Sequence, residues 1–278
     1  MSTRDSLLPE EVLAHYRDGA EMPRLTQGAG VLEFLRTQEL LGRYLPKPPA
    51  VILDVGGGPG VCAHWLSDCG YDVHLLDPVP LHVCQAADGS RLRAHPLVGD
   101  ARALPFDSES ADAVLLLGPL YHLTERPERL AAWREAFRVL RPQGRVFAAG
   151  ISRFASALDG LRSGHINDPA FVSIYQRDLQ DGQHRNQSNN PFYFTTSYFH
   201  QPSELCDEMR EIGFHHEATF GVEGPTWLLQ DFPKQWADPS RRERLLEVAR
   251  AVEREPSLLG ASLHLLAVGA KTRERSER

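Results

Sequence analysis

A glycine-rich loop flanked by two acidic residues is the part of the sequence best suited to bind a polar ligand. Its G-x-G-x-G pattern consists of Gly56, Gly58 and Gly60. Glycine allows positive φ angles and lets a ligand approach the backbone closely. The helix expected after the loop offers free backbone N–H groups to the same ligand. Asp54 precedes the loop, and Asp77 lies 19 residues beyond Gly58. An acid at that point of an α/β unit binds ribose hydroxyls.

A nicotinamide dinucleotide is a competing ligand for such a loop. Its fingerprint is G-x-G-x-x-G, in which the third glycine lets the helix pack closely on the strand. Val61 occupies that third position here, and Gly60 completes the shorter pattern instead. The sequence therefore disfavours a nicotinamide-dependent oxidoreductase.

Alternating strands and helices are expected to position these residues. Short apolar runs predict strands at 51–55, 73–76, 92–98, 113–117 and 145–149. Amphipathic patterns predict helices at 29–45, 61–69, 79–88 and 126–140. This alternation implies right-handed βαβ units and a parallel sheet. Ligands of such sheets bind beyond the carboxyl ends of the strands, which is where the glycine loop and Asp77 lie.

The pattern changes after residue 150. Residues 152–201 are polar and irregular, with weak helices near 152–162 and 168–181. A long irregular segment usually serves as a binding loop or lid, and a plain structural cover is the alternative. The remaining elements are a helix at 203–212, strands at 214–221 and 261–269, and one further helix at 230–256.

Ordered motifs over residues 45–150 resemble those of class I S-adenosylmethionine-dependent methyltransferases. The run VILDVGGGPG at 51–60 is similar to their first motif, and Asp77 to the acid that binds both ribose hydroxyls. Further matches follow in the family's order: GDARALPF at 99–106, DAVLLLGPLYHL at 112–123 and LRPQG at 140–144. An N-terminal set also resembles a bacterial small-molecule subgroup of the family: Tyr16, Glu21, Arg24, Leu25, Glu33, Arg36 and Thr37.

The resemblance implies a doubly wound, mostly parallel, seven-stranded α/β sheet of the Rossmann-like methyltransferase type with a helical or irregular lid insertion. Four parts are expected: an N-terminal helical cover at 1–45, a cofactor-binding core at 46–151, a lid or substrate insertion at 152–201, and a C-terminal part at 202–278 that completes the sheet.

The resemblance also implies the cofactor, S-adenosyl-L-methionine, with S-adenosyl-L-homocysteine as its product. The residues that it implies for cofactor binding are Asp54, Gly56, Gly58, Gly60, Asp77, Pro78, Asp100, Ala101, Gly118 and Leu120. Pro78 would pack on the adenine, Asp100 would accept from its amine, and Gly118 and Leu120 would flank the methyl group. Structural roles remain open for the three acids: Asp54 could support the loop, Asp77 could cap a helix, and Asp100 could stabilise a turn.

Two N-terminal residues, Tyr16 and Arg24, are candidates to bind the cofactor's carboxylate. Arginine suits a bidentate contact with a carboxylate, and a surface ion pair is the alternative.

The acceptor side of the reaction is less readable from the sequence. The sulfonium methyl is already activated, so placing the acceptor in line supplies most of the rate, about 7–11 kcal/mol. A base is needed only where the acceptor must lose a proton. His122 is the first candidate base because its ordinary pKa is near 6.5, and a structural role is equally open. Tyr121 and His200 are the next candidates, and no metal is expected.

The composition of the chain limits the classes of binding partner that we expect. The 278 residues carry 30 Lys and Arg against 37 Asp and Glu, a net charge of −7 that argues against nucleic-acid binding. The four cysteines form no Cys-x-x-Cys pair, and no signal peptide or membrane span is expected. We therefore expect a cytoplasmic monomer or homodimer that acts on a small molecule, on O, N or C, without membrane or nucleic-acid partners. A peptide or protein methyltransferase and a non-catalytic cofactor-binding module remain alternatives.

Overall fold

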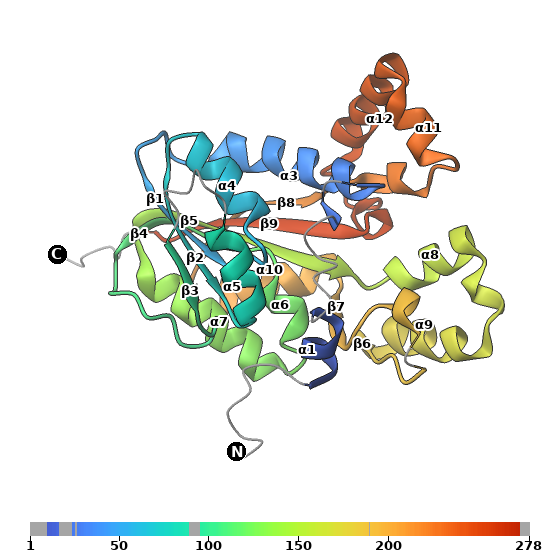
Figure 1. The fold of residues 1–278 in the computed structure, drawn as a ribbon, viewed down its shortest axis with the longest axis horizontal. Coiled ribbons are helices and arrows are strands. Elements are labelled where there is room, and N and C mark those ends of the chain that lie inside the picture. The colour runs from blue at the N-terminus through green and yellow to red at the C-terminus, as the bar shows by residue number, and fades with distance from the viewer. Residues whose placement is uncertain (1–9, 17–23, 26, 89–94, 189, 273–278) are drawn as a thin grey trace.

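The computed structural model describes residues 10–16, 24–25, 27–88, 95–188 and 190–272. The rest of the predicted N-terminal cover, the start of the predicted strand at 92–98 and the end of the C-terminal part lie outside these residues. A central twisted sheet carries helices on both faces, and two helical extensions lie beyond one end of it (Figure 1).

All seven predicted strands are present in one sheet. Their spatial order is β3 (His95–Val98), β2 (Asp72–Asp77), β1 (Val51–Val55), β4 (Ala111–Leu116), β5 (Leu140–Ser152), β9 (His264–Ala270) and β8 (His215–Gly221). The first five run parallel, whereas β9 is antiparallel to both of its neighbours. The parallel strands therefore end at a common edge, and the chain order reverses between β1 and β4 at that edge.

Helices cover the two faces through separate apolar clusters. One cluster joins the sheet to α3 (Gly30–Tyr44), α4 (Val61–Asp68) and α5 (Pro80–Ala87). The other joins it to α7 (Arg126–Val139) and α10 (Pro202–Glu211). Proline occupies the first turn of α5, α7 and α10, where its missing N–H removes no helical hydrogen bond. Two short helices, α1 (Glu10–Tyr16) and α6 (Pro119–His122), lie near the carboxyl edge of the strands.

Residues 152–201 are more regular than the sequence predicted. They form α8 (Ala155–Ser163), η1 (His165–Asn167), α9 (Pro169–Asp181), β6 (Gln183–His184), η2 (Pro191–Tyr193) and β7 (Ser197–His200). β7 pairs with the last two residues of β5, and β6 pairs with β7, so that the sheet formed by the described residues has nine strands. Buried polar pairs stabilise this segment: the His184 ring lies 2.9 Å from the Asp178 carboxylate and 2.8 Å from the Tyr193 carbonyl oxygen. Because these contacts are polar, they produce no apolar periodicity from which the elements could be predicted.

The single helix predicted at 230–256 is two helices, α11 (Phe232–Ala237) and α12 (Pro239–Val252). The break follows from Asp238, whose side chain accepts hydrogen bonds from the first N–H groups of α12, with Pro239 next to it. Short turns η3 (Gly224–Leu228) and η4 (Leu259–Ala261) flank this region.

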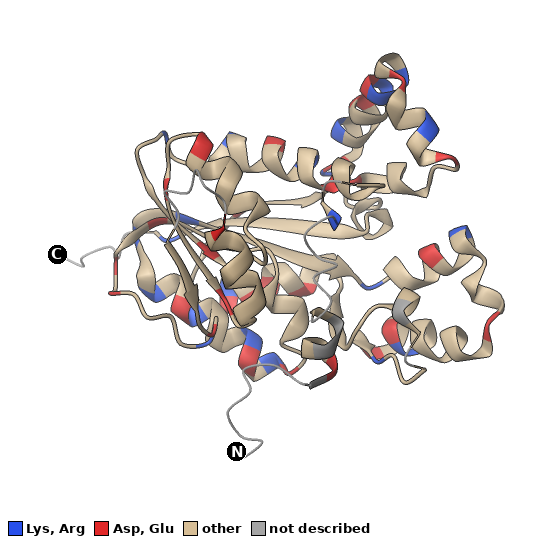
Figure 2. Ribbon diagram, in the orientation of Figure 1, with Lys and Arg blue, Asp and Glu red and all other residues tan. Residues whose placement is uncertain are grey.

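Charged residues of both signs alternate along the outer helices, as α7 and α12 show in Figure 2. Several of them form ion pairs, such as that between Arg250 and Glu243 on α12. In the described part of the chain, no helix is both long and apolar enough to cross a membrane.

Candidate active site

Two backbone loops touch each other at the carboxyl edge of the sheet. The loop after β1 contains Gly56, Gly58 and Gly60, with φ angles of +73°, +56° and +88°. The loop after β4 begins at Gly118, and a Cβ atom added there would lie 2.7 Å from the carbonyl oxygen of Gly56. Both loops therefore need glycine, the first for its conformation and the second for the close approach.

Asp77 ties the glycine loop to the end of β2. Its buried carboxylate accepts hydrogen bonds from the backbone N–H groups of Gly58 and Val79, each at 2.9 Å. The Nδ1 atom of His82 lies 3.1 Å from the same group. An ionised carboxylate has about four acceptor positions, so part of this capacity stays open toward the adjacent cavity.

Asp54 is the most unusual group at this edge. Its side chain is 1% exposed, and neither carboxylate oxygen has a hydrogen-bond partner among the described residues. Burial, with a smaller effect of the Asp77 charge, raises the pKa of Asp54 to about 7. A buried carboxylate without a partner is costly, and a cationic ligand group would remove that cost.

Three cavities meet over these residues. The Asp77 cavity, about 80 Å³, is lined by Tyr16, Gly56, Gly58, Leu76, Asp77, Pro78, Val79, His82, Asp100, Ala101, Gly118, Pro119, Tyr121, His122 and Leu123. The Asp54 cavity, about 90 Å³, contains Asp54 and the same glycines, with Arg24, Glu33, Tyr121 and His264 in its wall. The aromatic cavity, about 340 Å³, extends from Tyr121 to α8, α9 and η3. Tyr121 lines all three cavities and so marks their junction.

Most of the cofactor residues predicted from the sequence lie in these cavities. Tyr16 lines the Asp77 and aromatic cavities, and Arg24 lines the Asp54 and aromatic cavities. Gly60 and Leu120 line none of them. Gly60 instead precedes α4, and the helical turn of α6 directs Leu120 into the apolar core.

Asp100 lines the Asp77 cavity, but its carboxylate is engaged. It binds the side chain of Arg102 at 2.6 Å and accepts from the Arg102 backbone N–H at 2.8 Å. The turn-stabilising role considered for Asp100 is therefore present in the structure.

The three residues predicted as candidate bases lie in different surroundings. His122 lines only the Asp77 cavity, where its Nε2 lies 2.7 Å from the hydroxyl of Tyr16. His200 is fully buried, packs against Gly150 and lines none of the three cavities, and burial lowers its pKa. Its position thus gives it no access to an acceptor. Tyr121 is the one of the three that reaches the aromatic cavity.

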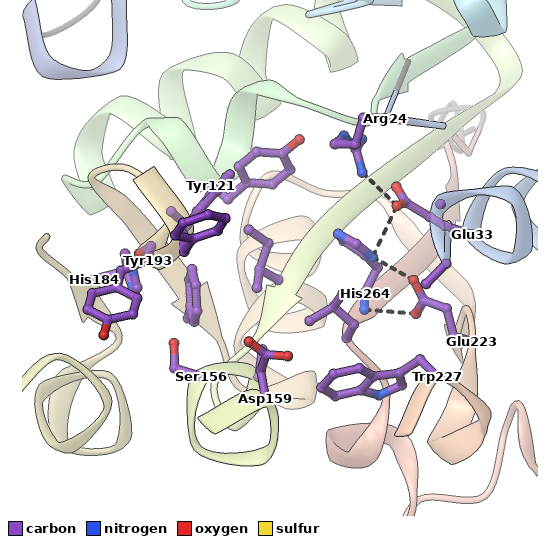
Figure 3. A pocket seen from close by; sticks show the side chains of 18 of the residues that line it. Arg24, Glu33, Tyr121, Ser156, Asp159, His184, Tyr193, Glu223, Trp227 and His264 are labelled. Carbon is purple, nitrogen blue, oxygen red and sulfur yellow. Dashed lines mark hydrogen bonds and ion pairs between the residues drawn. The ribbon is translucent and has the colours of Figure 1, made fainter. Parts of the chain in front are cut away.

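A polar cluster in the wall of the aromatic cavity contains two residues, Glu223 and His264, that the sequence did not predict (Figure 3). The Nδ1 atom of His264 lies 2.6 Å from Glu223 Oε1, and the His264 backbone N–H donates to Oε2 at 3.0 Å. Glu33 lies 3.7 Å from the same Nδ1 and is ion-paired with Arg24 at 2.6 Å. Glu223 and His264 belong to no motif, so no local pattern marks them.

The charges of this cluster act on each other. Burial lowers the pKa of His264, but Glu33 and Glu223 outweigh that effect and hold it above its ordinary value. Burial raises the pKa of Glu223, whereas His264 and the hydrogen bonds to the carboxylate hold it below its ordinary value.

The residues fit S-adenosylmethionine. Asp54 offers an unpartnered carboxylate to an ammonium group, and Asp77 has about one acceptor position left for a ribose hydroxyl. The two glycine loops leave the backbone bare between these carboxylates. When bound, the cofactor would supply an activated methyl group, and Tyr121 lies where the Asp54, Asp77 and aromatic cavities meet.

Comparison with known proteins agrees with this arrangement. A family model described as a methyltransferase domain matches residues 52–144. A demethylmenaquinone methyltransferase from Roseiflexus castenholzii is 32% identical over 191 residues, which cover 65% of this chain and 74% of that protein. A ubiquinone/menaquinone biosynthesis C-methyltransferase from Acidiphilium cryptum is 32% identical over 193 residues, 67% of this chain and 75% of that protein.

The fold is shared with a solved methyltransferase. The crystal structure of an S-adenosylmethionine-dependent methyltransferase from Methanosarcina mazei matches with a TM-score of 0.59 at 18% identity, covering 84% of this chain and 98% of that chain. The motifs, the strand order and these relatives lead to one conclusion. The chain belongs to the class I S-adenosylmethionine-dependent methyltransferases, enzymes for which S-adenosylmethionine is the cofactor.

Proposed function

We propose that this methyltransferase acts on a small aromatic molecule bound in the aromatic cavity. The observation that carries the proposal is the cavity itself, which opens from Tyr121 and is walled by rings. Those rings belong to Tyr16, Tyr121, Phe171, Phe192, Tyr193, Phe194, Phe199 and Trp227. Its volume of about 340 Å³ falls within the range of about 300–1,000 Å³ that is typical of small-molecule sites.

Aromatic walls favour a flat acceptor because offset and edge-to-face ring contacts contribute about 0.5–1.5 kcal/mol each beyond burial. The names of the two relatives refer to quinones, which are flat ring compounds and support the same class of acceptor.

The four cysteines are free thiols, which supports the cytoplasm as the compartment.

The chain's own residues perform placement in this proposal. Asp54 and Asp77 fix the two ends of the cofactor, and the rings of the aromatic cavity hold the acceptor against Tyr121. Excluding water from this junction strengthens the electrostatic contacts around the reacting atoms. Holding both reactants in line is the largest contribution that the protein makes.

The test is methyl transfer from labelled S-adenosylmethionine to 1-naphthol and 1,4-dihydroxynaphthalene, with a peptide mixture as a separate arm. We expect labelled naphthalene products, whose carbon or oxygen methylation is read by mass spectrometry and NMR. Trp227→Leu should raise KM for the naphthol about tenfold through the loss of ring contacts, without weakening the binding of S-adenosylhomocysteine.

Trp65→Leu is the matched control because Trp65 lies on α4, outside the aromatic cavity, and it should change neither quantity. Labelling of peptides alone would replace the proposal with a peptide methyltransferase. Tight binding of S-adenosylhomocysteine without transfer to either kind of acceptor would indicate a non-catalytic binding module.

A further inference from the structure

We propose that His264 and Glu223 form a proton-accepting pair in which Nε2 of His264 takes the proton of an acceptor hydroxyl. This inference rests on the proposed function, since it assigns a base to the aromatic cavity. None of the residues predicted from the sequence as bases belongs to this pair.

Glu223 is held so that it can orient the imidazole. Its Oε2 atom accepts hydrogen bonds from the Ser262 hydroxyl at 2.9 Å and from the His264 backbone N–H at 3.0 Å. Its Oε1 atom faces His264 Nδ1 at 2.6 Å. Two hydrogen bonds to Oε2 thus fix the carboxylate, in addition to the contact of Oε1 with the ring. A carboxylate held on Nδ1 keeps the proton on that atom and leaves Nε2 as the basic nitrogen.

The other edge of the imidazole points into the cavity, on the side of Tyr121 (Figure 3). His264 lines both the aromatic cavity and the Asp54 cavity. Its polar contacts involve Nδ1 and the backbone, and Nε2 has no hydrogen-bond partner among the described residues. A proton acceptor therefore faces the junction at which the acceptor must meet the methyl group.

The chemical step balances with groups already assigned. The acceptor O–H bond breaks, its proton forms a bond to Nε2, and the electron pair stays on the acceptor oxygen. That oxygen bonds to the methyl carbon as the carbon–sulfur bond breaks, and the sulfur keeps the bonding pair. The proton on His264 is then lost to solvent.

The charges around His264 set the pH range of this step. Glu33 on α3 and Glu223 face the ring, Arg24 is paired with Glu33, and Tyr121 lies across the cavity. The net effect of burial and of these charges is to raise the pKa of His264. A base acts only when unprotonated, so the rate should fall as pH drops through a value above 6.5, the ordinary pKa of histidine.

A cation is the competing occupant of the same cluster, because ligand atoms of Glu33, Glu223 and His264 lie within 4.8 Å of one another. Two contacts favour the proton instead. The guanidinium of Arg24 already lies 2.6 Å from Glu33, and His264 Nδ1 already faces Glu223. A metal ion would have to displace both contacts.

The decisive measurement is nitrogen NMR of histidine-labelled enzyme with bound S-adenosylhomocysteine. We expect neutral His264 to carry its proton on Nδ1, and Nε2 to titrate with a pKa above 6.5. His264→Gln identifies the signal, and His215→Gln, an exposed residue on β8, is the control. Glu223→Gln should lower the pKa of His264, because the carboxylate charge is lost. A proton on Nε2 in the neutral form, or direct binding of stoichiometric Zn²⁺ by His264, would overturn the pair.

Turnover of 1-naphthol gives the second readout. His264→Gln should lower kcat about 10²–10⁴-fold while leaving KM for naphthol nearly unchanged. Glu223→Gln should lower kcat less and move the acidic limb of the rate profile to lower pH. Near-normal kcat in folded His264→Gln would refute the assignment. If the wild type methylates no naphthol, the proposed function fails, whereas the NMR measurement still decides the pair.

Discussion

Replacing Asp54 with asparagine should make the ligand-free protein more stable at alkaline pH. Asp54 is buried without a hydrogen-bond partner among the described residues, and its pKa is about 7 rather than 3.8. The unfolded chain releases this proton near the lower value and the folded chain near the higher one. Stability therefore falls as pH rises between them.

The magnitude follows from the two pKa values. The difference between about 7 and 3.8 corresponds to about 4 kcal/mol at 1.36 kcal/mol per pKa unit. Asp54→Asn removes this penalty, so above pH 8 the variant should exceed the wild type by up to about 4 kcal/mol. Near pH 4 the two proteins should differ little. The same variant should bind S-adenosylhomocysteine about 10–100-fold more weakly, because a charge-assisted hydrogen bond worth about 1.5–3 kcal/mol is lost.

Urea unfolding at several pH values measures the first effect, and calorimetry measures the second. In wild type, binding near pH 6 should also release a proton as the ammonium group of the ligand ionises Asp54, which calorimetry detects by comparing two buffers. Asp68→Asn, the same change at the exposed last residue of α4, is the control. Equal pH dependence in wild type and Asp54→Asn, or unchanged affinity, would refute the reasoning.

Two further substitutions test the packing that holds the site. Gly118→Ala should weaken binding of S-adenosylhomocysteine at least tenfold, since the new methyl group would lie 2.7 Å from a carbonyl oxygen, whereas Gly42→Ala meets nothing within 4 Å and should leave binding unchanged. Calorimetry on both variants decides this. Arg129→Met should lower the free energy of unfolding in urea by about 3–5 kcal/mol, because it leaves the buried carboxylate of Glu208 without its guanidinium partner. Arg126→Met, which breaks an exposed pair on the same helix, should cost about 1 kcal/mol or less, and equal losses would contradict the argument.

The cofactor side of the fold was predictable because its signals are local. Apolar runs and turn residues mark the strands from β1 to β5, and parallel strands must end at one edge. Asp54 is the penultimate residue of β1 and Asp77 is the last residue of β2, so their meeting at the glycine loop follows from the pattern alone. The G-x-G-x-G loop is recognisable because its backbone conformation and close contacts require residues without side chains.

The pairing of His264 with Glu223 was not predictable, for a physical reason. β9 inserts antiparallel between β5 and β8, and this pairing brings His264 to Glu223 across 41 residues. No repeating pattern records a strand insertion of that kind. The predicted base His122 follows β4, and the turn of α6 places it in the Asp77 cavity. Leu120 shares that turn and faces the core.

The pairing of β5 with β7 brings together the two ends of the segment that contains α8 and α9, so that this segment can be exchanged as a unit. The pairing is confined to Ile151 and Ser152, and the side chain of Arg153 reinforces it by donating to the Phe199 carbonyl at 2.8 Å. The chain between these two points supplies α8, α9 and several cavity rings, yet contributes nothing to the Asp54 and Asp77 cavities. A chimaera that swaps this stretch for that of a relative, spliced at both ends of the pairing, would thus inherit a new acceptor range on an unchanged methyl-donor module.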